Sequence, residues 1–112
     1  MLPAASPDAA HDFARLDALV RPRSVAVIGA SDEPARIGGR PIAYMMGQKF
    51  AGDLWPVNPR RPTVQGLRAF ASVAELPAAP DVAIIAVPVE LAIQAVDDLG
   101  AKGCRAVICF TA

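Results

Sequence analysis

The chain has 112 residues, of which 54% are hydrophobic and 20% charged, and its formal net charge at pH 7 is zero. This length and apolar content predict one domain with a buried core rather than two. The balanced charge excludes the strongly basic field typical of nucleic-acid-binding proteins and of polybasic membrane anchors, so we expect neither nucleic acid nor a membrane as a partner.

The first residues do not have the pattern of a targeting segment. "MLPAASPDAAHDFARL" lacks a basic start followed by a continuous apolar core. The longest apolar run, "VAIIAV" at residues 82–87, is far shorter than the roughly 20 residues that a membrane span needs. We therefore expect a cytoplasmic protein, with a flexible leader at residues 1–12 and a folded domain at residues 13–112.

The folded domain is predicted to begin with a helix and a buried strand. Apolar side chains in residues 13–20 recur at helical spacing until Pro22 ends the pattern. They are Phe13, Leu16, Leu19 and Val20. Residues 24–29, "SVAVIG", form a short run that is too uniformly apolar for a half-exposed strand. Such a run is typical of a central parallel strand covered on both faces.

A second helix and two extended segments follow. The helix is expected at residues 39–50, because apolar residues recur there at helical spacing and Pro41 stands in the first turn, where a missing N–H costs nothing. Residues 53–59, "DLWPVNP", predict a second strand. Residues 63–70, "TVQGLRAF", predict a third, which Gly66 interrupts.

The last part of the chain predicts strand, helix and strand. Residues 81–87, "DVAIIAV", form a fourth strand, and residues 105–111, "RAVICFT", a fifth. Between them, a helix is marked by apolar residues and is expected to end at Gly100. Its apolar residues are Val89, Ala92, Ile93, Val96 and Leu99.

Alternating strands and helices predict an α/β fold, a Rossmann-like doubly wound parallel sheet of about five strands in the order 3-2-1-4-5. The ligand crevice is expected at the carboxyl ends of the strands at 24–29 and 81–87, where the order reverses. We also expect a domain that is incomplete at its C-terminus. The fifth strand would then lack a covering helix, which predicts self-association through it or marginal stability.

The loop "GASDEPARIGG", residues 29–39, lies between the first strand and a helix, where backbone N–H groups and the helix dipole attract anions. Glycine permits a tight exit from the strand and a close approach of backbone to phosphate. The candidate residues are Gly29, Gly38 and Gly39, with Ser31 as a hydroxyl donor and Arg36 and Arg40 as charges. The alternative is a simple connecting loop.

The spacing of these glycines argues against a dinucleotide. The loop lacks G-x-G-x-x-G, and Asp53 opens the second strand instead of standing at its tip, where it could bind ribose hydroxyls. The tip reads "VNPRR", in which Asn58, Arg60 and Arg61 suit an additional ribose phosphate. Either the 3′-phosphate of coenzyme A or the 2′-phosphate of NADP would fit, and a solvated basic turn is the alternative.

Three blocks of the sequence resemble the coenzyme A-binding domain that opens the NDP-forming acyl-CoA synthetases, which are related to the α subunit of succinyl-CoA synthetase. The blocks are "LDALVRPRSVAVIGASDEPARIGGRPI", "GDLWPVNPRRPTVQGLRAFASVAELP" and "PDVAIIAVP". The resemblance covers residues 16–112. It implies coenzyme A as ligand and the remaining domains or subunit of a synthetase as partner.

The resemblance also implies a role for individual residues. Those that would hold the coenzyme A phosphates are Ser31, Asp32, Arg36, Gly38 and Gly39. Those that would hold the adenosine end are Val57, Asn58, Pro59 and Arg60. Those that would flank the ligand are Val87, Pro88, Val89, Phe110 and Thr111. The family more often has lysine where Arg36 and Arg60 stand, which keeps the charge and alters the contact geometry.

Catalysis is not expected from this chain alone. In enzymes of this type a histidine is phosphorylated, an acyl phosphate forms and the thiol attacks it, and that histidine lies in the following domain. The only histidine here is His11, in the leader, and we do not expect it to be catalytic. Cys104 and Cys109 have no metal-binding or redox spacing. The other functions considered are an NAD(P)-binding oxidoreductase domain and a regulatory or scaffold module without ligand.

Overall fold

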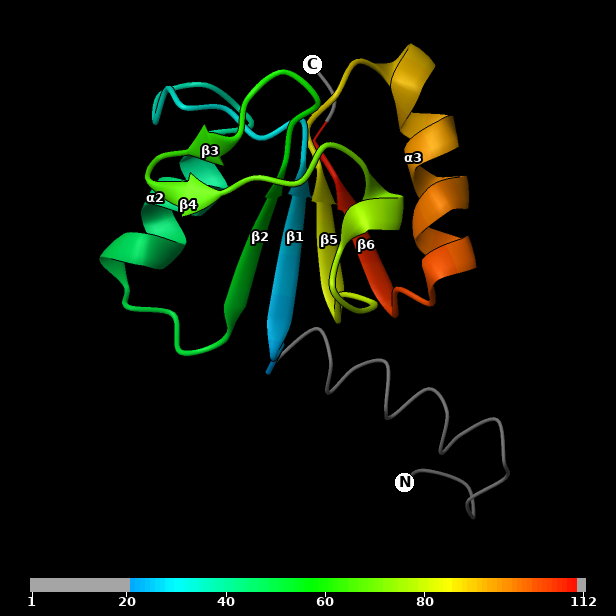
Figure 1. Ribbon diagram of the computed structural model, residues 1–112, viewed down its shortest axis with the longest axis horizontal. Helices are drawn as coiled ribbons and strands as arrows, with labels where there is room; N and C mark the ends of the chain where they lie inside the picture. The colour runs from blue at the N-terminus through cyan, green and yellow to red at the C-terminus, as the bar shows by residue number, and fades with distance from the viewer. Residues whose placement is uncertain (1–20, 111–112) are drawn as a thin grey trace, which may run out of the picture.

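The structure is a computed structural model, and it describes residues 21–110. Its centre is a sheet of four parallel strands in the order β2-β1-β5-β6. The strands are β1 (Ser24–Ile28), β2 (Asp53–Val57), β5 (Val82–Ile85) and β6 (Ala106–Cys109). The α/β class, the parallel sheet and the order of these four strands confirm the prediction (Figure 1). The helix predicted at residues 13–20 lies outside the described residues.

The predicted third strand is a hairpin instead. β3 (Thr63–Val64) and β4 (Leu67–Arg68) pair antiparallel in a separate two-stranded sheet. Gln65 and Gly66, which join them, have φ values of +48° and +82°. Two such residues form the tight reversal of a hairpin, so the chain cannot continue along the edge of the main sheet. Within residues 21–110, the backbone of this segment pairs with β2 through the isolated bridge between Val57 and Phe70, and the main sheet has four strands rather than five.

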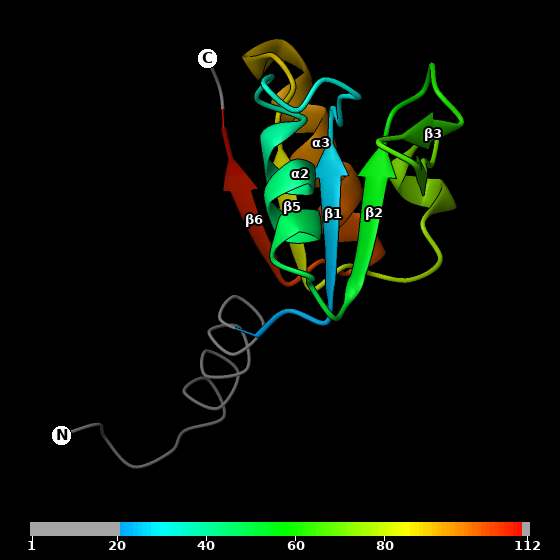
Figure 2. The same ribbon diagram turned by 90° about the vertical axis from the view of Figure 1, so that its left-hand side faces the viewer.

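Helices cover both faces of the sheet (Figures 1 and 2). α2 (Arg40–Gly47) and the hairpin pack on one face, and α3 (Val89–Lys102) with the short 3-10 helix η1 (Val73–Glu75) packs on the other. All five residues of β1 are buried, as a strand between two layers requires. Its side chains alternate between the two hydrophobic clusters, which places β1 at the centre of the core.

α3 differs from its prediction in two respects. Ala92 and Leu99, two of the five apolar residues by which the helix was predicted, are buried together with Ala95, whereas Val89, Ile93 and Val96 are exposed, Ile93 by 71%. The helix continues through Gly100 and ends at Gly103, whose φ of +95° is the left-handed cap conformation. The helix packs on the sheet through Ala92, Ala95 and Leu99, and this leaves a neighbouring apolar stripe exposed to solvent.

Hydrogen bonds connect the amino ends of β1 and β5 at the edge of the sheet opposite the predicted crevice. Asp81 accepts a hydrogen bond from the Arg23 N–H (2.8 Å), and its own N–H donates to Ser24 Oγ (3.0 Å). Asp53 stands at the same edge, as the first residue of β2. Its carboxylate is therefore not at the tip of β2, where a dinucleotide-binding domain would need it.

Candidate functional site

The loop between β1 and α2, residues 29–39, folds over the carboxyl ends of the strands. The N–H groups of Gly29 and Ala30 both donate to the Val57 carbonyl of β2, at 3.2 Å each. The Ser31 N–H then donates to the Gly38 carbonyl (3.2 Å), which closes the loop on itself. The prediction that this loop lies at the point where the strand order reverses is thus confirmed by the topology.

Two glycines are required by the packing of the loop itself. A Cβ on Gly38 would overlap the carbonyl oxygen of Gly29, and a Cβ on Gly39 would overlap that of Glu33. Both residues are buried. Gly29 has φ +80° and lies against Val87 and the Ala86 carbonyl. The glycines therefore shape the loop, and Gly29 makes the tight exit from the strand that was predicted for it. The approach of a phosphate to Gly38 and Gly39 stays a prediction.

Side chains from distant segments hold the loop in place. Asn58 Nδ2 donates to the Ala30 carbonyl (2.9 Å), and Gln65 Nε2 donates to the carbonyls of Ser31 (2.9 Å) and Gly39 (3.0 Å). The Gln65 N–H donates to Asp32 Oδ1 (2.7 Å). Gln65 was not among the residues predicted for the site. A glycine after it, between two short β segments, was the available signal for a hairpin tip at this position.

A cleft of about 660 Å³ lies within this loop. Its predicted lining residues are Gly29, Ser31, Asp32, Arg36, Gly38 and Asn58, and the structure brings them together. The backbone N–H groups of Ile37 and Gly38, which also line the cleft, have no acceptor among the described residues. Such unpaired donors are suited to an anionic oxygen. Gly39 does not line the cleft, because this residue is buried in the loop.

A second hollow of about 600 Å³ adjoins the cleft at the tip of β2. Its lining includes three arginines, Arg60, Arg61 and Arg68, and it shares Asn58 and Arg61 with the cleft. Asn58 Oδ1 accepts the Arg60 N–H (2.8 Å), which fixes the turn after β2. The predicted residues Asn58, Pro59 and Arg60 line this hollow, whereas Val57 is buried beneath it and contributes its carbonyl to the loop.

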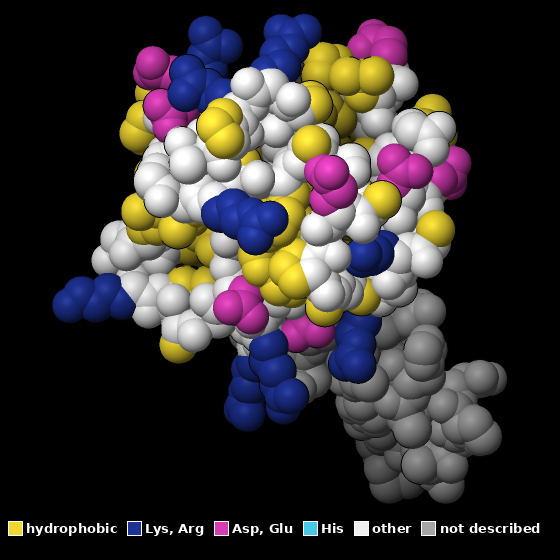
Figure 3. Space-filling view, viewed as in Figure 1, with side chains coloured by type: hydrophobic (Ala, Val, Ile, Leu, Met, Phe, Trp, Pro, Cys, Tyr) yellow, Lys and Arg dark blue, Asp and Glu magenta, His cyan; other side chains and the backbone are white. Residues whose placement is uncertain are grey.

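The charges at this edge are only partly paired. Arg61 lies 3.3 Å from the Asp32 carboxylate, and no other salt bridge occurs within residues 21–110. The guanidinium of Arg68 lies 5.0 Å from the centre of the Phe70 ring. Figure 3 shows basic side chains along the upper edge of the molecule, where the strands end, with acidic ones beside them. Arg36 and Arg60 are exposed there.

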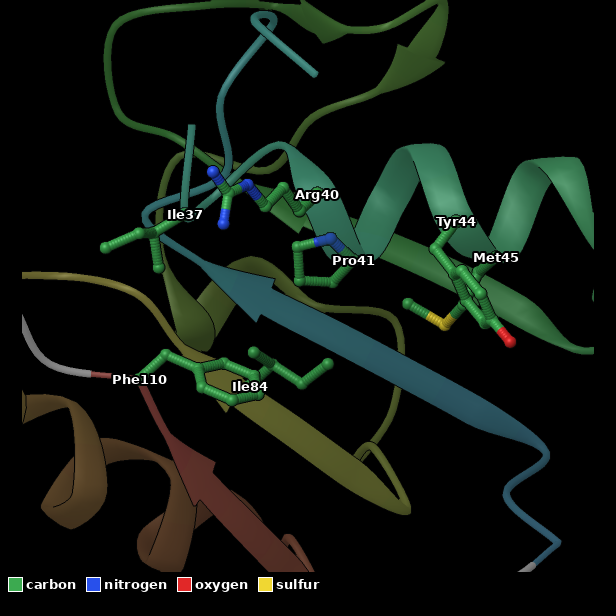
Figure 4. A pocket seen from close by; sticks show the side chains of 7 residues that line it. All are labelled: Ile37, Arg40, Pro41, Tyr44, Met45, Ile84 and Phe110. Atoms are coloured by element: carbon green, nitrogen blue, oxygen red, sulfur yellow. The ribbon is translucent and has the colours of Figure 1, made fainter. Parts of the chain in front are cut away.

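The remaining predicted residues lie around the cleft rather than in it. Val87 packs against Gly29, and Pro88 is the N-cap of α3, directly after β5. Phe110 lines a third, apolar hollow of about 520 Å³ on the α2 face of the sheet, and Figure 4 shows its ring beside Ile84. Thr111 lies outside the described residues.

Cysteines and acidic residues form no further site in the described part of the chain. Burial raises the pKa of the Cys104 thiol, whose Sγ donates to the Ala106 carbonyl (3.3 Å), and Cys109 is exposed. Residues 21–110 contain no group of three or more His, Cys, Asp or Glu side chains that could hold a metal ion. No helix among them is long and apolar enough to cross a membrane.

Comparison with known protein families shows which family the chain belongs to. A family model described as "CoA binding domain" matches residues 23–112. The chain belongs to this CoA-binding domain family. The match begins just before β1 and includes both hollows at the carboxyl edge of the sheet.

Curated relatives of this CoA-binding domain are much longer proteins. Trans-feruloyl-CoA synthase from an unknown prokaryotic organism is 42% identical over 98 residues, which are 88% of this chain and 14% of that protein. Subunit alpha of the ADP-forming acetate–CoA ligase II of Pyrococcus furiosus is 39% identical over 97 residues, 87% of this chain and 21% of the subunit. The chain thus spans only a small part of the curated relatives it matches.

This fold occurs in solved structures of both long and short chains. Acetyl-coenzyme A synthetase 1 of Ca. Korarchaeum cryptofilum, in complex with phosphate and ADP, matches with a TM-score of 0.75 and 34% identity, over 80% of this chain and 19% of that one. A hypothetical protein from Pyrococcus horikoshii OT3 matches with a TM-score of 0.73 and 27% identity, over 96% of this chain and 74% of that one. The domain therefore occurs both within large synthetases and as most of a small chain.

Proposed function

We propose that this chain is the coenzyme A-binding domain of an ADP-forming acyl-CoA synthetase. In this proposal it binds coenzyme A by its phosphates, while other domains or a partner subunit perform the chemistry. The names of the long relatives, a feruloyl-CoA synthase and ADP-forming acetate–CoA ligases, support this reaction class. Coenzyme A is the ligand, and the rest of the synthetase is the partner.

The observation that carries the proposal is the pair of adjoining hollows joined through Asn58 and Arg61. Coenzyme A has two groups of negative charge, a pyrophosphate and a 3′-phosphate on its ribose. The free N–H groups of Ile37 and Gly38, with Ser31 and Arg36, suit the pyrophosphate. The arginine-lined hollow suits the adenosine end and its 3′-phosphate, with Arg60 as the main charge.

The pantetheine arm would leave the cleft along the turn that follows β5. Val87, Pro88 and Val89 provide an apolar surface there, directly beside Gly29 at the wall of the cleft. Phe110, which directly follows β6, would flank the thiol end, and the same role is proposed for Thr111. The thiol would then point away from the sheet, toward the domain that supplies the acyl phosphate.

Isothermal titration of the chain with coenzyme A, dephospho-coenzyme A and NADP tests this function at low salt. We expect coenzyme A to bind about tenfold more tightly than dephospho-coenzyme A, since one charge-assisted contact contributes roughly 1.5 kcal/mol. Arg60→Ala should abolish that preference. Arg105→Ala is the matched control, because this exposed arginine lies at the opposite edge of the sheet, just before β6.

The outcomes separate the candidate functions. An equal loss of affinity in Arg60→Ala and Arg105→Ala would show a general charge effect and reject the role of Arg60. Binding of NADP alone would reject coenzyme A as the ligand. If no nucleotide bound to a folded chain, the function as a ligand-binding domain would be wrong.

A further inference from the structure

The hollow at the tip of β2 contains an arginine that the proposed function leaves without a role. Arg60 and Arg61 stand in the turn after β2, whereas Arg68 comes from β4, in the hairpin beside that tip (Figures 1 and 2). Arg68 is exposed, and its side chain makes no hydrogen bond or salt bridge to another residue of the described part of the chain. Glu75 lines the same hollow, but its carboxylate accepts the Ala71 N–H (3.0 Å) instead. The guanidinium of Arg68 is therefore available to a ligand.

An aromatic ring supports this guanidinium. The central carbon of the Arg68 guanidinium lies over the Phe70 ring, 5.0 Å from its centre, which is within the range of a cation–π contact. The Phe70 N–H donates to the Pro56 carbonyl, and the Phe70 carbonyl accepts the Asn58 N–H, at 2.9 Å each. Backbone hydrogen bonds thus fix Phe70 at the tip of β2. The guanidinium rests on a ring that cannot move independently of the strand.

The arrangement favours a flat group as the partner of Arg68. Phe70 is only 9% exposed, so a group that enters the hollow meets the guanidinium rather than the ring below it. Arginine stacks its planar guanidinium on aromatic groups, nucleotide bases included. Charge alone does not require this third arginine, because the adenosine end of coenzyme A carries a single phosphate on its ribose and Arg60 and Arg61 already line the hollow.

We propose that Arg68 binds the adenine base of coenzyme A by stacking, while the arginines of the turn after β2 contact the 3′-phosphate. This inference rests on the proposed function, because it takes coenzyme A as the ligand. The hollow of about 600 Å³ lies within the size range of small-molecule sites. The base would lie on Arg68, and Arg68 on Phe70, so that the cation is stacked between two flat groups.

The alternative role for Arg68 is a charge contact to phosphate. Lysine keeps the positive charge but lacks the planar group, so Arg68→Lys separates stacking from charge. A stacking residue affects only ligands that carry a base. A phosphate contact affects every ligand that carries the phosphate. Arg60→Ala provides the contrast, because the loss of a phosphate contact should weaken ligands with and without a base equally.

NMR titration with adenosine 3′,5′-bisphosphate and ribose 3,5-bisphosphate tests the stacking, since these probes share their phosphates and differ in the base. We expect the chain to bind the adenosine compound at least about fivefold more tightly. Arg68→Lys should reduce this preference to less than about twofold, by weakening the adenosine compound alone. Arg105→Lys is the matched control, because Arg105 is exposed at the opposite edge of the sheet, just before β6. An unchanged amide spectrum verifies that each variant is folded.

Each result decides the inference. A preference that is lost in Arg68→Lys and kept in Arg105→Lys supports stacking on Arg68. A parent chain that binds neither probe, or both equally, overturns it, as does a preference that survives Arg68→Lys. An equal loss of affinity for both probes in Arg68→Lys would make Arg68 a phosphate contact and reject stacking. Titration of the same samples with coenzyme A tests the proposed function separately. If the base preference followed Arg68 but coenzyme A did not bind, Arg68 would be supported as a base-stacking residue and coenzyme A rejected as the ligand.

Discussion

The two loops that form the candidate site are built in opposite ways. The loop at residues 29–39 is held by hydrogen bonds from Asn58 and Gln65, and its glycines Gly38 and Gly39 are buried against backbone carbonyls. The turn at residues 58–62 is exposed from Pro59 onward and presents arginines to solvent. The first loop supplies shape and backbone donors, and the second supplies charge.

This difference predicts which substitutions damage folding and which damage binding. A change at the buried glycines of the first loop must disturb the backbone near the core, since these residues pack against backbone carbonyls. A change among exposed arginines should leave the fold intact, because surface substitutions usually alter stability by less than about 0.5 kcal/mol. The Arg60→Ala titration tests the expected effect of the exposed arginines on binding. The substitutions that follow test the expected effect of the loop at residues 29–39 on stability.

Gly38→Ala is expected to have the largest effect. Its Cβ would overlap the Gly29 carbonyl oxygen, so the backbone of the loop must move. We expect a loss of roughly 3 kcal/mol or more in the free energy of unfolding, and a fall in Tm of more than about 12 °C. Coenzyme A binding should be lost with it. Thermal unfolding by circular dichroism and titration would measure the two effects.

Gly100→Ala is the matched control for that substitution. Gly100 lies within α3, and a Cβ there has no atom within 4 Å. Alanine should therefore stabilise the helix by roughly 0.5–1 kcal/mol and raise Tm by a few degrees. If Gly38→Ala were as stable as the parent chain, the close packing of Gly38 against the Gly29 carbonyl would be contradicted.

Gln65→Asn should have an intermediate effect on both properties. Asparagine tolerates the positive φ of this position, but its shorter side chain cannot reach the carbonyls of Ser31 and Gly39. Losing two hydrogen bonds predicts a stability decrease of roughly 1–2 kcal/mol and weaker coenzyme A binding. Thr63→Ala, at an exposed position of the same hairpin, is the control. Unchanged binding in Gln65→Asn would mean that the hairpin does not position the loop.

The sequence allowed the position of the site to be predicted, but not the contacts that hold it. Buried strands such as β1 are uniformly apolar, and the loop after β1 carries glycines, so both have local signals. The hydrogen bonds of Gln65 join residues 26 to 34 positions apart and leave no local pattern. Gly66 was interpreted as an interruption of a strand, whereas it completes a reversal.

The orientation of α3 could not be derived from its periodicity for a related reason. Both of its stripes are apolar, the buried one with Ala92, Ala95 and Leu99 and the exposed one with Ile93 and Val96, so that two of the three buried residues are alanines. A pattern of hydrophobicity favours the larger side chains, whereas close packing on the sheet favours the small ones.

Asp32→Asn is expected to have the smallest effect and gives the finest test of the comparison. Asparagine keeps an oxygen that can accept the Gln65 N–H, but removes the negative charge that lies 3.3 Å from Arg61. Because an exposed ion pair contributes about 0–1 kcal/mol, Tm should change by only a few degrees. Coenzyme A affinity should rise about two- to fivefold, since a carboxylate no longer competes with phosphate for Arg61. Titration at low and high salt would measure this gain, which should shrink as salt screens the charges. A loss of affinity would instead mean that the carboxylate positions Arg61 for the ligand, and the two loops would then share one binding role.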